Sequence, residues 1–146
     1  MKTISLRFGE QFAPECGTIA EHQKVISEKE FVWYGKLGTP VSIAVAEEIL
    51  SQDSPAILLI SSGKQERYWA YINAIQRETP DIEWIPEYYR DKASQFKTWF
   101  RVTRFEPAPK DVMSEWVVAS SGKPLNEVSR HSMSPYFIIE PRRKKN

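Results

Sequence analysis

Aromatic side chains beside lysine or arginine recur along this sequence, and their chemistry is its most distinctive feature. Flat aromatic faces stack on nucleobases or enclose a methylated group, while Lys and Arg side chains meet phosphate oxygens. Such groups occur in predicted strands and in two long polar segments: Trp33, Tyr34 and Lys36; Lys64, Arg67 and Trp69; Trp84, Tyr88, Tyr89 and Arg90; Lys97, Trp99, Arg101 and Arg104; Arg130 and His131. The pattern predicts a binding surface suited to a nucleic acid.

The surroundings of each aromatic residue decide whether binding or packing is the better prediction. Tryptophans in strands usually pack in or beside the core, and we expect this for Trp69 and Trp99. Trp84, Tyr88 and Tyr89 instead lie in residues 79–95, which show no helical or alternating pattern. Loops of this length are uncommon in compact domains and are often functional. We therefore expect at least one of these three rings to contact a ligand.

Residues that would support catalysis or hold a metal ion form no recognisable constellation. Cys16 is the single cysteine, which excludes an internal disulfide and a multi-cysteine zinc site. His22 falls on the apolar face of a predicted helix, where a place in the core is expected. The sequence contains no HExxH, CxxC, GxSxG, Walker or Rossmann pattern. We therefore predict no enzymatic activity, no cofactor and no metal.

The composition is that of an ordinary globular domain, with 41% hydrophobic and 27% charged residues. The formal net charge is +1, so a nucleic-acid site has to be a local patch and not a global positive field. No stretch has the length and apolarity of a signal peptide or a membrane span, which leads us to expect a cytoplasmic protein without a membrane partner.

Short strands and helices follow one another without a βαβ rhythm. Alternation and apolar runs predict strands over residues 3–8, 30–37, 56–60, 67–76, 96–105, 115–119 and 136–140. Helical spacing predicts helices over 19–28, with a capping box of Thr18 and Glu21, and over 41–52, opened by Thr39 and Pro40. The segments 106–113 and 120–134 are predicted to be connecting loops, and 79–95 a loop with at most one helical turn.

These elements predict an α+β domain: a small mixed or antiparallel β-barrel of about six strands flanked by helices. Strict alternation in 96–105 places Arg104 on the face of Phe100 and Val102, opposite Arg101. We expect one domain over residues 1–140, in which 1–29 form a strand–helix extension, followed by a basic disordered tail over 141–146.

The order of elements and several short runs resemble a known superfamily. Residues 55–76, PAILLISSGKQERYWAYINAIQ, resemble the central hairpin of PUA-like domains of the YTH and EVE type. Residues 84–105, WIPEYYRDKASQFKTWFRVTRF, are similar to the aromatic loop and basic-aromatic strand that follow in a YTH domain. SGKPLNEVSR at 121–130 looks like that family's late loop, and EFVWYGKLGTPVSIAVAEEIL at 30–50 sits where it has its first strand and helix.

The resemblance implies a β-barrel with a pocket between sheet and loops that holds a flipped-out base. That base is typically modified, such as methyladenine in RNA or a modified cytosine or adenine in DNA. By position, Trp84 matches a cage aromatic, and Tyr34, Gly35 and Lys36 match the strand end that lines the pocket. Ser61 and Ser62 match its floor, and Arg130 matches a phosphate contact. Such a domain serves as a recognition module, fused to or associated with an effector protein.

The combined prediction is a nucleic-acid-binding module that reads a methylated base. The predicted ligand-binding residues are Trp33, Tyr34, Lys36, Ser61, Ser62, Trp84, Tyr88 and Tyr89. The predicted phosphate-binding residues are Lys64, Lys97, Arg101, Arg104, Arg130 and His131. RNA and DNA are equally compatible with this pattern.

Two alternatives remain open. The near-neutral charge and the Tyr, Trp and Arg content also suit a protein–protein interaction module, either an adaptor or an inhibitor. An enzyme acting on a nucleotide ranks last, because no base or nucleophile stands out. Nucleic-acid binding should weaken steeply with salt, whereas an apolar protein interface should not.

Overall fold

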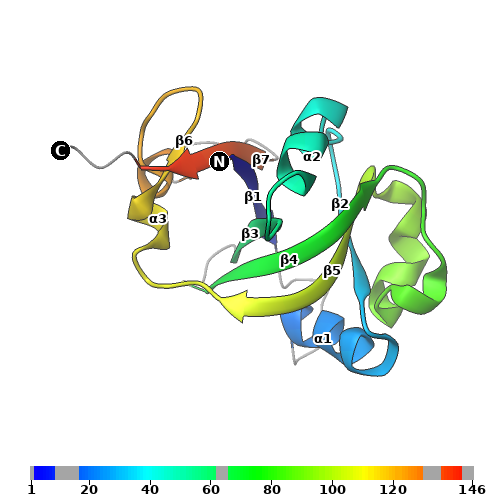
Figure 1. The fold of residues 1–146 in the computed structure, drawn as a ribbon. Coiled ribbons are helices and arrows are strands. Elements are labelled where there is room, and N and C mark those ends of the chain that lie inside the picture. The colour runs from blue at the N-terminus through cyan, green and yellow to red at the C-terminus, as the bar shows by residue number, and fades with distance from the viewer. Residues whose placement is uncertain (1, 9–16, 62–65, 130–135, 143–146) are drawn as a thin grey trace.

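A computed structural model describes residues 2–8, 17–61, 66–129 and 136–142 of the chain. It contains a seven-stranded sheet flanked by helices (Figure 1), which confirms the predicted α+β class. The strands are β1 (Thr3–Phe8), β2 (Val32–Lys36), β3 (Ala56–Ser61), β4 (Arg67–Gln76), β5 (Thr98–Pro107), β6 (Trp116–Val118) and β7 (Tyr136–Pro141).

The sheet has the strand order β2-β5-β4-β3-β1-β7-β6 and is mixed. β1 runs parallel to β3, and the other neighbours pair antiparallel. β1, which the sequence places in an N-terminal extension, lies between β3 and β7 and so belongs to the middle of the sheet. In the described part of the chain β2 and β6 are the edge strands, without a pairing that joins them into a barrel.

Alternation along the strands sends one set of side chains to an inner face and the other to an outer face. The inner face holds the main core, built from all strands except β6, with residues such as Ile4, Leu59, Ile72 and Phe100. Its residues come from positions two apart in β1, β2 and β3, as the periodicity predicts. The outer face carries two smaller clusters at opposite ends of the sheet.

Helix α1 (Thr18–Lys29) packs Ile19, Val25 and Ile26 against the main core. The predicted capping box is wrong, because the helix begins one residue earlier than expected. Gly17 is the N-cap, with a φ of 90° that favours glycine, and its carbonyl accepts the bond from Glu21 N–H. Thr18 is therefore already helical and is not the N-cap.

Helix α2 (Ile43–Leu50) packs on the same core through Val45, Ile49 and Leu50. It begins two residues later than 41 because the Ser42 hydroxyl accepts from Val45 N–H at 3.2 Å and so fixes the N-cap. α1 contacts β2 and β5, whereas α2 contacts β4 and β1. In the described residues no helix is long and apolar enough to cross a membrane.

The segment after β4 is not the loop that the sequence predicts. It forms two 3₁₀ helices, η1 (Ile82–Trp84) and η2 (Glu87–Gln95), which cover the outer face beside β2 and β5. Two other predicted loops contain the short helices α3 (Val112–Glu115) and α4 (Leu125–Ser129), which cover the outer face near β6 and β7. Helices of one turn have too few residues to show a period in the sequence.

Two irregularities in the β4–β5 pairing correct the predicted face of Arg104. Tyr71 pairs with Arg104 and Ile72 with Val102, so Thr103 of β5 has no pairing partner. Ala74 then pairs with Arg101, so Asn73 of β4 has no pairing partner either. Each bulge shifts the alternation by one residue. Phe105 returns to the main core, and Arg104 joins Arg101 on the outer face instead of lying with Phe100.

Candidate nucleic-acid interface

The outer face at the β2 edge carries a group of aromatic rings held by the 3₁₀ segment. Trp33 and Trp99 are buried there together with Ile85, which anchors the segment to the sheet. Next to that anchor, the Trp84 ring lies parallel to Phe31, with 5.5 Å between ring centroids and an angle of 7°. Trp84 is therefore presented at the surface by its neighbour Ile85, which has no exposed area.

Basic side chains lie against these rings. Lys29 Nζ is 5.5 Å from the centroid of Trp84, and the Arg101 guanidinium is 5.3 Å from Phe31 and 5.8 Å from Trp33. Arg101 Nε donates to Asn73 Oδ1 at 2.6 Å, a bond that the bulge at Asn73 makes possible by turning this residue out of the ladder. The guanidinium is thus held in place across the sheet.

A second arginine continues the same arrangement along β4 and β5. Arg104 lies 4.0 Å from the ring centroid of Tyr71, close enough for a cation–π contact. We call these side chains together the aromatic–basic strip; its members are Lys29, Phe31, Trp33, Tyr71, Asn73, Trp84, Arg101 and Arg104. It crosses the outer face of β2, β5 and β4.

Acidic residues near the strip reduce its positive charge only weakly. Glu83 lies 3.8 Å from Lys29, and Glu106 lies 3.9 Å from Arg104. All four side chains are largely exposed, and ion pairs of this kind contribute about 1 kcal/mol or less. The two cations remain able to meet a phosphate, and Arg101 has no ion pair with a described residue.

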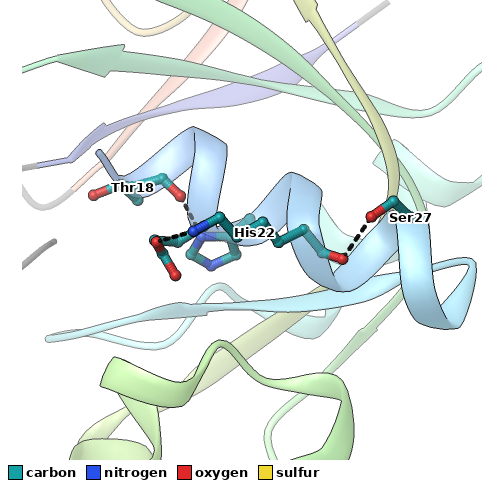
Figure 2. A network of polar contacts seen from close by, with 5 residues as sticks. Thr18, His22 and Ser27 are labelled. Atoms are coloured by element: carbon teal, nitrogen blue, oxygen red, sulfur yellow. Dashed lines mark hydrogen bonds and ion pairs between the residues drawn. The ribbon is translucent and has the colours of Figure 1, made fainter. Parts of the chain in front are cut away.

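The predicted residues Tyr34, Tyr88 and Tyr89 lie elsewhere, around the buried His22 of α1. The imidazole centroid is 5.0 Å from the rings of both Tyr34 and Tyr89. Figure 2 shows the His22 ring projecting from α1, with its Nδ1 bonded to the carbonyl of Thr18 at 2.8 Å. Because a carbonyl only accepts, Nδ1 carries the proton and Nε2 has none.

Burial sets the protonation states in this group. It lowers the pKa of His22 from 6.5 to about 4, against smaller opposing effects of the Thr18 carbonyl and Glu21. Burial also raises the pKa of Tyr89 well above 10, and the neighbouring Tyr34 and Tyr88 add to the increase. His22 and Tyr89 are therefore uncharged at neutral pH, and they pack together with the rings of Tyr34 and Tyr88.

Lys36 and Ser61 also face inward and are buried. Lys36 Nζ donates to the carbonyls of Leu37 and Thr39, at 3.0 and 2.5 Å, and lies 4.9 Å from the Tyr136 ring. Burial lowers the pKa of Lys36 below its usual value. Ser61 Oγ is buried and makes no hydrogen bond with a described residue.

The structure thus divides the predicted site residues between two faces. Trp33, Trp84, Arg101 and Arg104 are on the outer face, whereas Tyr34 and Lys36 are on the inner face, because neighbouring residues of β2 alternate. Lys97 is exposed just before β5. Ser62, Lys64, Arg130 and His131 lie outside the described residues.

Sequence reasoning did not single out Phe31, Lys29 or Tyr71. The alternation of β2 does contain the signal for Phe31, because residues 31 and 33 share a face. The alternation of β4 likewise places Tyr71 on the face of Trp69, but only the bulges bring Arg104 to it. Lys29 had no comparable signal, because it lies at the end of α1. Within the described residues, no group of His, Cys, Asp and Glu could hold a metal ion.

Comparisons with known proteins bear on what this strip can do. Searches of curated proteins and of solved structures gave no match. A family model described as Pua-like matches residues 4–135, which is most of the chain. Domains of this family commonly bind RNA, which is consistent with a surface of aromatic rings and arginines. The match confirms the resemblance at the level of the superfamily, and the chain belongs to the Pua-like family.

Proposed function

We propose that this protein binds single-stranded RNA through the aromatic–basic strip. The observation that carries the proposal is the placement of Arg101 among Phe31, Trp33 and Asn73. An arginine whose Nε is bonded to Asn73 keeps the N–H groups of both terminal nitrogens for a phosphate, in a geometry that is already fixed. Less side-chain freedom is then lost on binding.

Stacking supplies the second component of the proposal. The Trp84 ring stacks on Phe31, and Lys29 Nζ lies 5.5 Å from its centroid. Lys29 is an exposed, flexible side chain, which a base can displace at little cost to reach the ring. Stacking of this kind requires bases that are not paired, which favours single strands over duplexes.

We further propose that Trp84 forms one wall of a cage for an extruded base, with a preference for a methylated one, as in domains of the YTH and EVE type. The Trp84 side chain is half-buried, so part of its ring remains accessible to a base. The cost of unstacking a base is a few kcal/mol, and the cage contacts have to offset it.

Replacing Arg101 by alanine tests the phosphate contact. We expect the affinity for a labelled single-stranded RNA to fall roughly five- to tenfold at 0.1 M salt, with the salt slope reduced by about 0.7. Fluorescence anisotropy at several salt concentrations measures both. Arg7→Ala is the matched control, because Arg7 is exposed on β1, three strands away from β5. An equal loss in both variants would contradict the assignment.

Replacing Trp84 by alanine tests the stacking contact. Loss of one base–aromatic stack should weaken binding by about 1–3 kcal/mol with little change in the salt slope, since no charge is removed. The titration uses oligonucleotides with and without N6-methyladenine or methylcytosine, as RNA and DNA. A preference for a methylated base that disappears in the variant supports the cage. If the unchanged protein binds all oligonucleotides equally, the cage proposal is rejected, but the proposal of RNA binding stands.

A protein partner is the competing function, and one observation favours it. Ile82 is 53% exposed in η1, close in sequence to Trp84, where an apolar contact surface would extend the strip. Salt separates the two functions. An apolar interface should change little between 0.05 and 0.3 M salt, whereas RNA binding should weaken steeply.

A further inference from the structure

A pocket of about 340 Å³ opens on the outer face beyond the far end of the strip. It lies between the start of β1, the turn from α2 to β3, and the strands β4 and β6. Its lining consists of Thr3, Gln52, Asp53, Ser54, Ala56, Trp69, Tyr71 and Trp116. The volume lies in the range of small-ligand sites, and three aromatic rings give it flat apolar walls.

The aromatic walls come from two strands that are distant in the sequence. Trp69 of β4 and Trp116 of β6 are half-buried, and their ring centroids are 5.1 Å apart at an angle of 58°. Both rings pack on their inner side against the cluster that includes Val112, Met113 and Leu125. This support fixes the two rings as a wall and leaves part of each exposed to the pocket.

Three side chains of the lining already use their hydrogen-bond donors within the protein, whereas the Ser54 hydroxyl and the indole N–H groups of Trp69 and Trp116 are further donors. Thr3 Oγ1 donates to the Ala56 carbonyl at 2.5 Å. Gln52 Nε2 donates to the carbonyls of Lys2 and Glu48, at 2.5 and 3.4 Å. Tyr71 is hydrogen-bonded to Glu106, which together with burial raises its pKa. The Gln52 carbonyl oxygen and the Asp53 carboxylate remain as acceptors.

Asp53 gives the pocket a negative charge. Among the described residues of the lining it is the only charged one; it is exposed, and no described residue forms an ion pair with it. A phosphate would be repelled from such a site, and the carboxylate favours a ligand edge that carries donors over one that carries only acceptors. A flat ligand with two neighbouring donors fits, because a carboxylate can accept both at once.

Among the four RNA bases, guanine fits these requirements best. Its Watson–Crick edge carries N1–H and the 2-amino group side by side, and both can donate to one carboxylate. The amino groups of adenine and cytosine stand next to an acceptor nitrogen, which a carboxylate repels. Uracil has a single N–H between two carbonyls.

The pocket is continuous with the aromatic–basic strip through Tyr71. The Tyr71 ring lines the pocket, and the Arg104 guanidinium lies 4.0 Å from the centroid of this ring. A nucleotide with its base against Trp69 and Trp116 would therefore have a guanidinium nearby for its phosphate, outside the negatively charged lining. This arrangement favours a nucleotide within a strand over a free cation.

We propose that the pocket formed by Trp69, Trp116, Tyr71 and Asp53 binds an unpaired guanine of the RNA strand that crosses the aromatic–basic strip. The inference rests on the proposed RNA binding and adds a base preference to it. It assigns a binding role to Trp69, for which the sequence predicts a place in the core, and to Trp116 and Asp53, which the sequence analysis does not single out.

The test compares otherwise identical oligouridylates with one central guanosine, inosine, adenosine or cytidine. For the unchanged protein we expect guanosine to bind on the order of tenfold tighter than adenosine or cytidine, with inosine between them because it lacks the 2-amino group. Asp53→Asn should remove this preference, so that the guanosine and adenosine oligonucleotides bind with equal affinity. Glu47→Gln, the same change of charge on an exposed residue of α2 outside the pocket, should keep the preference.

Two results would overturn the inference. One is equal affinity for all four oligonucleotides, which leaves RNA binding intact, and the other is a preference for guanosine that survives Asp53→Asn. If no oligonucleotide binds, the proposed function fails. The pocket is then tested separately by titrating the protein with GMP and with AMP and monitoring the indole N–H signals of Trp69 and Trp116 by NMR. If the two indole signals shift with GMP and not with AMP, the guanine site is supported. If they shift equally with both nucleotides, the guanine site is rejected.

Discussion

Gly35→Ala is expected to destabilise the protein by at least about 2 kcal/mol, although it adds a single methyl group. A Cβ at this position would lie 2.6 Å from Cγ of Phe96 and 2.9 Å from two further ring atoms. The Phe96 ring has no room to retreat, because Tyr89 stacks on it at 4.8 Å and Trp99, which is fully buried, meets its edge at 5.1 Å. Urea unfolding followed by tryptophan fluorescence measures the loss.

Gly122→Ala is the matched control for this prediction. Gly122 has a φ of 71°, and nothing lies within 4 Å of the place its Cβ would take. The backbone strain alone should cost about 1 kcal/mol. If Gly35→Ala cost no more than Gly122→Ala, the 3₁₀ segment would not be packed against β2 as described, and the support of Trp84 would fail with it.

Stability is expected to fall by about 3 kcal/mol as the pH decreases from 6.5 to 4, because of His22 alone. The folded protein holds the His22 pKa at about 4, below the value of 6.5 for the unfolded chain. The unfolded state therefore binds a proton through this interval while the folded state does not. The contribution is fully present above pH 6.5 and is lost as the pH falls toward 4.

Two measurements test the His22 prediction. Urea unfolding at several pH values gives the slope of the free energy of unfolding, and His22→Gln, which cannot titrate, should reduce that slope. An NMR titration of the imidazole follows the group itself, so the test does not depend on how well the variant folds. Titration of His22 near pH 6.5 in the folded protein would contradict its burial among Tyr34, Tyr89 and Phe105.

The regular strands could be predicted from the sequence because their side chains alternate over several residues. β1, β3 and β4 have the predicted starts, and every predicted strand is present. Boundaries set by a single local interaction could not be predicted, as at Gly17 and Ser42. The helices α3 and α4 were missed, since one turn gives no periodic signal.

The candidate site was predictable in part, and the limits have a physical cause. The sequence indicates Trp84, Arg101 and Arg104 by residue type alone. It could not show that two bulges bring Arg104 to the face of Arg101, because a bulge leaves no mark in a pattern of period two. Trp69 and Trp116 are distant in the sequence, and only the order of the strands and the connections between them bring their rings together.

Photo-crosslinking of a single-stranded RNA that contains 4-thiouridine tests the central claim most directly, because it locates the bound strand on the protein. After digestion with trypsin, crosslinked nucleotides should lie on the peptides 30–36 and 78–90, which carry Phe31, Trp33 and Trp84. The yield should fall in Arg101→Ala and stay unchanged in Arg7→Ala. Crosslinks confined to peptides without any residue of the aromatic–basic strip would contradict the account.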